Sequence, residues 1–334
     1  PTAAMRKAMA EAEVGDDVYG EDTTVNKLEV TAAARLGKEA GLFVVSGSMG
    51  NLVSALAWCD RGDELICGVD AHLLVNEMGA IAAFGGIQMR ALPNDDRGLL
   101  DPQLVDDTIS PMGGLFPRTA LLCLENTHNR GNGAAYGVAE MQPLADVAHH
   151  RGMRVHVDGA RIFNAAVALG VPVAELAGVA DSVTFCLSKG LSCPVGSVVT
   201  GPAEFIGRAR RIRKMLGGGM RQAGVITAAG LVALDTMVDR LAEDHANAKR
   251  LAEGLAGLPG VRIDPAAIET NIVYAELEDG RGPEASVALK ERGVLANGRF
   301  NWVRFVTRRG ITAEDVDEAL DVVASVLRER AGVR

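Results

Sequence analysis

Short apolar runs alternate with stretches of helical periodicity through the N-terminal part of the chain, over about 200 residues. The apolar runs predict β-strands over 41–45, 64–69, 87–92, 119–124, 153–158, 181–187 and 195–201. The stretches between them predict helices over 49–58, 72–84, 141–151 and 162–169. Strands that alternate with helices in this way form a mostly parallel sheet covered by helices on both faces. The sequence therefore predicts an α/β fold built on one large sheet.

The pattern changes near residue 225. A long helical stretch is predicted from 225 to about 258, and the remainder reads as strand, strand, helix, strand and helix. This part is predicted to form a small C-terminal α+β domain. We expect two domains: residues 1–235 with an N-terminal loop and the large sheet, and residues 236–334 with the long helix and the small domain.

Polar side chains follow four of the predicted strands at the point where each strand ends. They lie in the segments 46–51, 125–129, 158–161 and 188–189. Ligands of open α/β sheets bind at the carboxyl ends of the strands. We therefore expect these four segments to line one site.

The segment SGSMGN, at 46–51, is the candidate for binding a phosphate. Ser46, Gly47, Ser48 and Met49 join a strand to a helix, where small residues let the backbone approach an anion and free N–H groups bind it. A plain tight turn explains the same residues. The chain contains neither GxxxxGK[ST] nor GxGxxG, so one phosphate suits this loop better than a nucleotide.

Asp158 and Lys189 end two strands that are expected to be neighbours. A buried carboxylate needs a cationic or hydrogen-bonded partner, and the ring nitrogen of a cofactor is such a partner, although helix capping would also explain Asp158. Arg161, three residues later, is placed to bond an adjacent oxygen. Partial desolvation makes a lysine amine nucleophilic, although surface-loop lysines are commoner. Together these residues suit pyridoxal 5′-phosphate (PLP), carried by Lys189.

Composition excludes several other functions. The chain carries 34 Lys and Arg against 43 Asp and Glu, a net charge of −9, which argues against nucleic acid or an anionic membrane as the partner. No apolar run reaches the roughly 18 residues of a membrane span. The five cysteines include no CxxC pair and suggest reduced thiols in a cytoplasmic protein. HExxH is also absent, so no catalytic metal is expected.

At the level of whole segments, the chain resembles the PLP-dependent L-threonine aldolases of the low-specificity type, which have the aspartate-aminotransferase-like fold. The resemblance extends over essentially the whole chain. It rests on VGDDVYGEDTTVNKLE, SGSMGN, ENTHN, VHVDGARIFNAAVALGVPV, FCLSKGLSCPVGSV and RKMLGGGMRQAG.

The resemblance implies roles for individual residues around the cofactor. Lys189 matches the lysine that carries PLP, and Asp158 matches the acid bonded to its ring nitrogen. Gly47, Ser48 and Met49 match the phosphate cradle, and His72 matches the imidazole stacked over the ring.

The same comparison implies a substrate site that is shared between subunits. Arg161 matches the arginine near the ring hydroxyl and the substrate, Arg304 the one that clamps the substrate carboxylate, and His128 the histidine that faces the substrate hydroxyl. Tyr19 lies in the family's N-terminal loop near the site. Lys214 and Arg221 match basic residues supplied by a neighbouring subunit, which implies a homotetramer built from dimers.

The implied activity is cleavage of a β-hydroxy-α-amino acid such as L-threonine or L-allo-threonine to glycine and an aldehyde. The expected base is His128, with His72 or a held water molecule as rivals. Two alternatives stay open: another PLP enzyme on the same scaffold, such as an aminotransferase or a different lyase, and a non-catalytic relative that binds a partner.

Three features depart from the family pattern. The family usually opens with a strand that contains Ser-Asp-Thr-Val-Thr, whereas this sequence starts at Pro1, after that point. The family commonly has His where this chain has Arg308. The segment NRGNGAAYG, at 129–137, also differs from the usual shorter turn, so we expect a different loop over the site.

Overall fold

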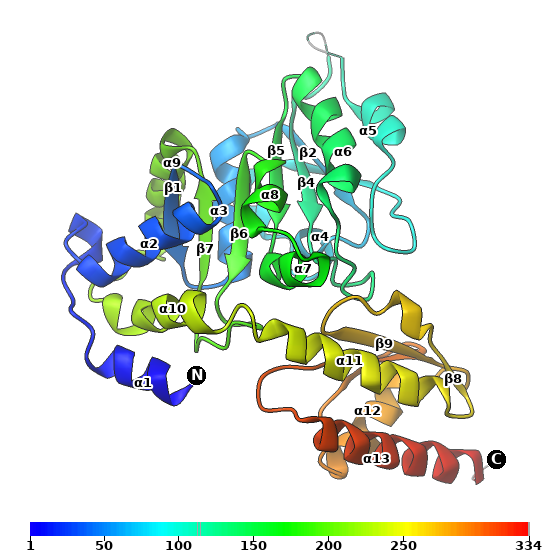
Figure 1. The fold of residues 1–334 in the computed structure, drawn as a ribbon. Coiled ribbons are helices and arrows are strands. Elements are labelled where there is room, and N and C mark those ends of the chain that lie inside the picture. The colour runs from blue at the N-terminus through cyan, green and yellow to red at the C-terminus, as the bar shows by residue number, and fades with distance from the viewer. Residues whose placement is uncertain (112, 114, 333–334) are drawn as a thin grey trace.

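The computed structural model describes residues 1–332 other than 112 and 114. Its N-terminal region is built on a seven-stranded sheet with the order β1-β7-β6-β5-β4-β2-β3 (Figure 1). Every strand except β7 runs in one direction, which confirms the predicted mostly parallel sheet. The strands are β1 (Ala40–Val44), β2 (Glu64–Gly68), β3 (Gln88–Leu92), β4 (Thr119–Glu125), β5 (Arg154–Asp158), β6 (Ser182–Cys186) and β7 (Ser197–Gly201).

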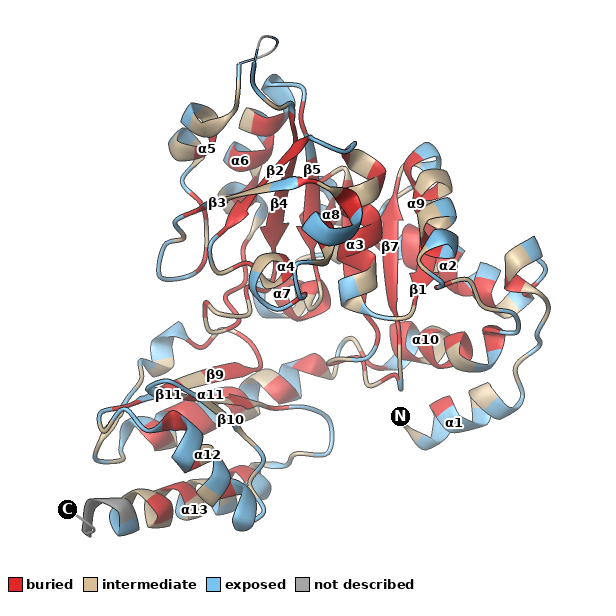
Figure 2. Ribbon diagram, turned by 180° about the vertical axis from the view of Figure 1, so that it is seen from behind, coloured by how far each residue is buried: buried red, intermediate tan, exposed pale blue. Residues whose placement is uncertain are grey.

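Helices cover both faces of this sheet, because its central strands are apolar on both sides. In β1, Leu42 and Val44 pack on one face and Phe43 packs on the other. The first face carries α3 (Gly47–Trp58) and α9 (Ala203–Met215). The second carries α2 (Thr23–Arg35), α6 (Val138–His150), α7 (Ile162–Leu169), α8 (Val173–Gly178) and α10 (Gly224–Thr236), with α1 (Ala3–Ala10) packed on α10. Figure 2 shows the sheet as a buried layer between them.

The predicted helix over 72–84 is wrong. The chain forms only a short α4 (His72–Val75) and a separate π-helical turn at Ile81–Gly85. Between them Met78 has φ 55° and Gly79 has φ 67°. Left-handed residues cannot continue a right-handed helix, so the segment turns and places Glu77 beside His72.

The C-terminal region contains a second, antiparallel sheet with the order β10-β11-β9-β8. It has one strand more than was predicted. The strands are β8 (Val261–Arg262), β9 (Ile272–Leu277), β10 (Asn297–Arg299) and β11 (Trp302–Val306). Alternate residues of β9 and β11 pack with α11 (Leu241–Ala256), α12 (Gly282–Glu291) and α13 (Ala313–Gly332). The opposite face of this sheet carries Tyr274 and Arg304, which lie against each other.

The predicted continuous helix from 225 to 258 is also wrong, because residues 237–240 interrupt it between α10 and α11. Helix α10 packs in the core of the large sheet, whereas α11 packs in that of the small one. The interruption lets the chain pass from one core to the other. The division into domains at 235 and 236 stays a prediction.

Three further helical elements connect these parts. They are α5 (Pro102–Thr108) and the 3₁₀ turns at Asp17–Tyr19 and Pro265–Ala267. All five cysteines are buried and unpaired. Within the described residues, no helix has the length and apolar character needed to cross a membrane.

Gly50 fixes how closely α3 approaches the sheet. A Cβ atom at this position would lie 2.4 Å from Cγ2 of Thr184 in β6. We expect Gly50→Ala to lower the free energy of unfolding by about 1–3 kcal/mol, since overpacking displaces neighbours. Gly207→Ala in α9, where a Cβ meets nothing within 4 Å, should be stabilising by up to about 1 kcal/mol. Calorimetry compares them, and equal melting temperatures would refute the close-packing argument.

Candidate active site

The candidate residues gather at the carboxyl edge of the large sheet. Ser46 follows β1, His72 follows β2 and His128 follows β4. Asp158 is the last residue of β5, and Lys189 comes three residues after β6. Because these five strands are parallel, their ends meet at one edge. The structure therefore places all the predicted strand-end residues on the same side of the molecule.

Asp158 belongs to a buried hydrogen-bonded group that also contains His72. The amide of Asn51, in α3, donates to Asp158 Oδ2 at 2.7 Å and to Glu77 Oε1 at 2.9 Å. Glu77 Oε1 lies 2.9 Å from Nδ1 of His72. This hydrogen bond to Glu77 raises the pKa of the His72 imidazole, assisted by the charges of Asp158 and Glu125 and opposed by burial.

Asp158 lacks an ionic partner among the described residues. Its carboxylate is 3% exposed and accepts only from two neutral donors, the Asn51 amide and the backbone N–H of Ala160. Buried carboxylates are stabilised by a cation. A protonated ring nitrogen supplies that cation, so Asp158 fits the pyridine ring of PLP. The site atoms of His72, Glu77 and Asp158 lie within 4.8 Å of one another, and the Asn51 amide donates to one oxygen of each acid.

The start of α3 has free donors for a phosphate group. Ser46 caps the helix, and its Oγ accepts from the backbone N–H of Met49 at 3.2 Å. The backbone N–H groups of Gly47 and Ser48 have no acceptor in the first turn, and Ser48 is exposed. A Cβ at Gly47 would lie 2.8 Å from Sγ of Cys186. The cradle predicted from the sequence is therefore compatible with an anion at a helix N-terminus.

Arg161 and Arg304 are the candidates for binding a second anion. Neither guanidinium belongs to an ion pair within the described residues, and the Nε atom of each is buried without a partner. Arg304 donates from Nη2 to Oδ1 of Asn129, at 2.8 Å, and lies against Tyr274. Burial and the positive charge of Arg304 lower the pKa of Arg161 to about 10. Two buried arginines that lack an ionic partner among the described residues, one of which lowers the pKa of the other, favour a carboxylate as their ligand.

Glu125 joins the segments that carry the two histidines. Its Oε2 accepts from the backbone N–H of His72 at 2.6 Å, and its Oε1 accepts from the backbone N–H of Asn129 at 2.7 Å. Burial raises the pKa of this carboxyl, although nearby His128 opposes the shift. The end of β4 thus sets the spacing between the start of α4 and the segment after His128.

His128 is buried, and its ring has one protein partner. The backbone N–H of Gly131 donates to Nδ1 at 3.1 Å, whereas Nε2 has no partner. The ring packs on Gly98, where an added Cβ would lie 2.3 Å from the imidazole. Since Nδ1 accepts a hydrogen bond, the proton of the neutral ring lies on Nε2. His128 therefore offers a donor to a ligand.

Lys189 is half-buried, and its side chain makes no hydrogen bond or ion pair with the described residues. It follows β6, which pairs with β5 through Val157 and Val183 and through Asp158 and Thr184. Lysine and acid therefore come from neighbouring strands, as the sequence predicted.

Tyr19, Lys214 and Arg221 are all exposed. Arg221 pairs with Asp16 at 2.6 Å and lies over the ring of Tyr19, which is 72% exposed. Within the described part of the chain, no contact joins these three residues to Asp158 or Lys189. They lie where a neighbouring subunit could reach them, and their roles stay predictions.

The basic segment RARRIRK, at 208–214, lies in α9, and its alternating basic residues suggest a solvated helix face, but one of them is buried. Arg213 is buried, donating to the carbonyl of Phe43 at 2.7 Å and to Oδ2 of Asp17 at 2.8 Å. It therefore ties the N-terminal loop to β1. Arg210 pairs with Glu29 at 2.5 Å.

The sequence reasoning missed several residues of the site. Asn51 and Glu125 lay in the collected strand-end segments but were given no role. Glu77 was hidden because a continuous helix was assumed around it. The positive φ of Met78 turns the chain so that Glu77 contacts His72. Nothing in the sequence indicates this backbone conformation.

Comparison with known proteins identifies the family. Residues 1–278 match the family model described as beta-eliminating lyase. The chain is 46% identical to the low-specificity L-threonine aldolase 1 of Arabidopsis thaliana, over 96% of this chain and 91% of that one. It is 43% identical to the low specificity L-threonine aldolase of Escherichia coli K12, over 95% and 93%.

A solved structure supports the fold assignment. The threonine aldolase of Leishmania major superposes with a TM-score of 0.81 at 18% identity, covering 97% of this chain and 95% of that one. Together with the sequence matches, this confirms the resemblance on which the site predictions rest. The chain belongs to the beta-eliminating lyase family and, within it, to the low-specificity L-threonine aldolases.

Proposed function

We propose that this protein is a PLP-dependent lyase that cleaves L-threonine, L-allo-threonine and related β-hydroxy-α-amino acids to glycine and an aldehyde. Identity above 40% to threonine aldolases over nearly the whole chain supports the activity. One structural observation carries this proposal. The buried acid Asp158 lacks a cationic partner, and the buried arginines Arg161 and Arg304 lack an anionic one among the described residues.

Each part of the cofactor has residues that would hold it. Lys189 would carry it covalently, Asp158 would face its ring nitrogen, and residues 46–49 would bind its phosphate. When bound, PLP supplies an electron sink for the bond that breaks in the substrate. Arg161 and Arg304 bind the substrate carboxylate and so orient the amino acid relative to the lysine.

The hydrogen bonds of the two histidines indicate different roles in proton transfer. Glu77 accepts the proton on Nδ1 of His72, which leaves a free lone pair on Nε2 of the neutral ring. His128 has the opposite arrangement, because Gly131 donates to Nδ1. We therefore favour His72 as the base for the β-hydroxyl proton and His128 as a donor to a substrate oxygen, which reverses the order that the sequence suggested.

The assignment of the base predicts a pH effect. Only the deprotonated ring accepts a proton, so activity on the acid side rises with pH through the raised pKa of His72. Replacing Glu77 with glutamine removes a negative charge beside the ring and lowers that pKa. The acid limb of kcat/KM should then move to lower pH by about one unit, while the rate at the plateau falls because the ring is less basic.

His128→Gln is the matched comparison. It should reduce the rate but leave the acid limb where it is in the unaltered protein. If His128→Gln moves the limb and Glu77→Gln does not, His128 is the base instead.

Two exposed methionines support assembly with further copies of the chain, and the resemblance to the family supports a homotetramer. Met78 is 99% exposed and Met215 is 81% exposed, although methionine is usually buried. Met78 directly follows Glu77, and Met215 directly follows Lys214. A second copy of the chain would cover these side chains. The five free thiols support a cytoplasmic location.

The experiment that tests the function is an assay of purified protein loaded with PLP. Threonine should yield glycine and acetaldehyde, and the acetaldehyde is measured by the NADH oxidation that a coupled alcohol dehydrogenase catalyses. In a separate spectrum, added glycine should produce a new visible absorption band. Amino transfer to a keto acid without acetaldehyde would favour an aminotransferase. A colourless protein after PLP addition would favour the non-catalytic alternative.

A further inference from the structure

The two arginines proposed to bind the substrate carboxylate come from different regions of the chain. Arg161 precedes α7 at the edge of the large sheet, whereas Arg304 lies in β11 of the small sheet. Their spacing therefore depends on how the small sheet is held against the large one. Whatever fixes that contact also fixes the geometry offered to a carboxylate.

Helix α11 packs on α7, and a further contact between the two regions is made through the loop that follows His128. Its backbone bends back on itself, with an isolated bridge between His128 and Ala134. Four hydrogen bonds join this loop to the C-terminal region: Ala135 N–H to Glu269 Oε2 (2.7 Å), Thr270 Oγ1 to the Gly133 carbonyl (2.6 Å), Tyr274 N–H to Asn132 Oδ1 (3.1 Å) and Arg304 Nη2 to Asn129 Oδ1 (2.8 Å). The loop at 129–137, which differs from the family pattern, thus connects the large sheet to the C-terminal region by hydrogen bonds.

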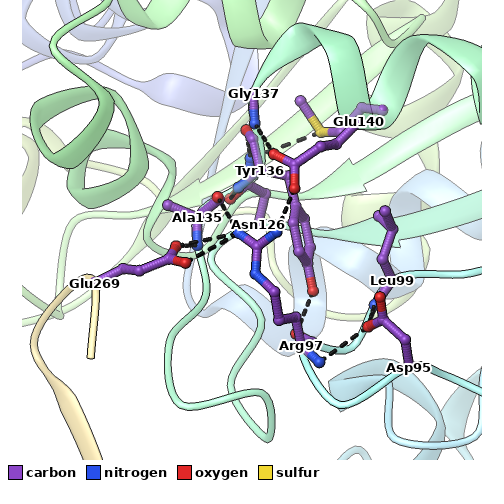
Figure 3. A network of polar contacts seen from close by, with 10 residues as sticks. Asp95, Arg97, Leu99, Asn126, Ala135, Tyr136, Gly137, Glu140 and Glu269 are labelled. Carbon is purple, nitrogen blue, oxygen red and sulfur yellow. Dashed lines mark hydrogen bonds and ion pairs between the residues drawn. The ribbon is translucent and has the colours of Figure 1, made fainter. Parts of the chain in front are cut away.

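Arg97 contacts both this loop and Glu269 of the C-terminal region (Figure 3). One of its Nη atoms bonds both carboxylate oxygens of Glu269, at 3.0 and 3.3 Å, and the carbonyl of Ala135 at 3.0 Å. Its other Nη atom pairs with Glu140, near the start of α6. The carbonyl of Arg97 accepts from the hydroxyl of Tyr136, and the guanidinium lies over the same ring.

The backbone next to Arg97 is packed against the site itself. The carbonyl of Arg97 lies so close to Gly131 that an added Cβ there would be 1.9 Å away. Gly98 has φ 99° and lies against the ring of His128. The same short segment therefore contacts the loop, the histidine and, through Glu269, the C-terminal region.

We infer that Arg97 is a positioning residue for substrate binding: through Glu269 it fixes the small sheet, and with it Arg304, relative to Arg161. The inference rests on the proposed role of the two arginines in binding the substrate carboxylate. Arg97 touches neither substrate nor cofactor, and it acts through the loop and through Glu269. Glu140, the other partner, belongs to the same region as Arg97 and does not link the two sheets.

This division between the two partners makes the inference testable. Glu269→Gln keeps the shape of the side chain but removes the charge that pairs across the two regions. Glu140→Gln makes the same chemical change on the other partner, within one region. The carboxylates are similarly accessible, with 33% and 32% of their side-chain surface exposed, so the variants are matched in solvent screening.

The measurements are steady-state cleavage of threonine, the dissociation constant of glycine from its visible absorption change, and thermal melting of the PLP-loaded protein. We expect Glu269→Gln and Arg97→Met each to raise KM and the glycine dissociation constant about fivefold, as befits a partly exposed charge network. The value of kcat should change by less than about twofold, the signature of lost uniform binding. Arg97→Lys should recover only part of the loss, because it lacks the planar fork.

Glu140→Gln is expected to leave KM and the glycine constant within about twofold of the unaltered protein, even if it lowers the melting temperature. The inference is overturned if Glu269→Gln binds glycine normally, or if Glu140→Gln weakens binding as much as Glu269→Gln does. Failure of Arg97→Met to fold leaves the Glu269 and Glu140 pair to decide. An unaltered protein that neither cleaves threonine nor binds glycine would instead refute the proposed function.

Discussion

Replacing Lys189 with alanine is expected to abolish threonine cleavage and the visible absorption of bound PLP. Covalent catalysis depends on a specific amine, and Lys189 follows β6, the strand that pairs with the end of β5 at Asp158. The fold should persist, because the side chain makes no hydrogen bond or ion pair with the described residues. Absorption spectra after PLP addition and far-ultraviolet circular dichroism measure the two effects separately.

Lys214→Ala is the informative comparison for this variant. Lys214 is exposed and is proposed to reach the phosphate of a neighbouring subunit, so its loss should weaken cofactor binding but keep the visible band. If Lys189→Ala still forms that band and Lys214→Ala does not, the covalent role belongs to Lys214.

The sequence carried the parts of the site that depend on strand ends. Alternating apolar runs located all seven strands of the large sheet, and the rule that ligands bind at carboxyl ends then collected Ser46, His128, Asp158 and Lys189. The placement of these residues could be predicted because it needs only local periodicity and a common strand direction, whereas their roles stay predictions.

The parts that were missed depend on contacts between distant segments. Arg213 follows the pattern of a solvated helix face, yet its partner Asp17 lies 196 residues away. Arg97 and Glu269 are 172 residues apart. The sequence around Arg213 or Arg97 does not indicate which acidic residue each one contacts. Charged residues are also common on protein surfaces. The same reasoning applies to Asn51, whose amide donates to two carboxylates from different segments, those of Glu77 and Asp158.

The helix predicted over 72–84 shows a different limit. Its residues favour a helix by composition, but the two positive φ angles at Met78 and Gly79 break it. Residues held in unfavourable backbone regions persist where the surroundings impose them, often at functional sites. Here the break places Glu77 against His72 and Asn51, so local propensity failed at a point where the site needed it to fail.

Asp158→Asn is expected to reduce kcat by about 10²–10³, because it removes the charge that stabilises the electron sink. The strand should be preserved, since asparagine is the same size and can still accept from the backbone N–H of Ala160. Lys189 is intact in this variant, so the visible band should remain while the rate falls. That combination distinguishes it from Lys189→Ala, which loses both.

The effect of Asp158→Asn should also reach His72. Asp158 is one of the charges that raise the pKa of the His72 imidazole, and the Asn51 amide joins it to Glu77. Removing this negative charge should lower the pKa of His72 and move the acid limb of kcat/KM to lower pH, in the same direction as Glu77→Gln. A variant with a kcat within tenfold of the unaltered protein, or with an acid limb moved to higher pH, would show that the acid and the base are not coupled as the hydrogen bonds indicate.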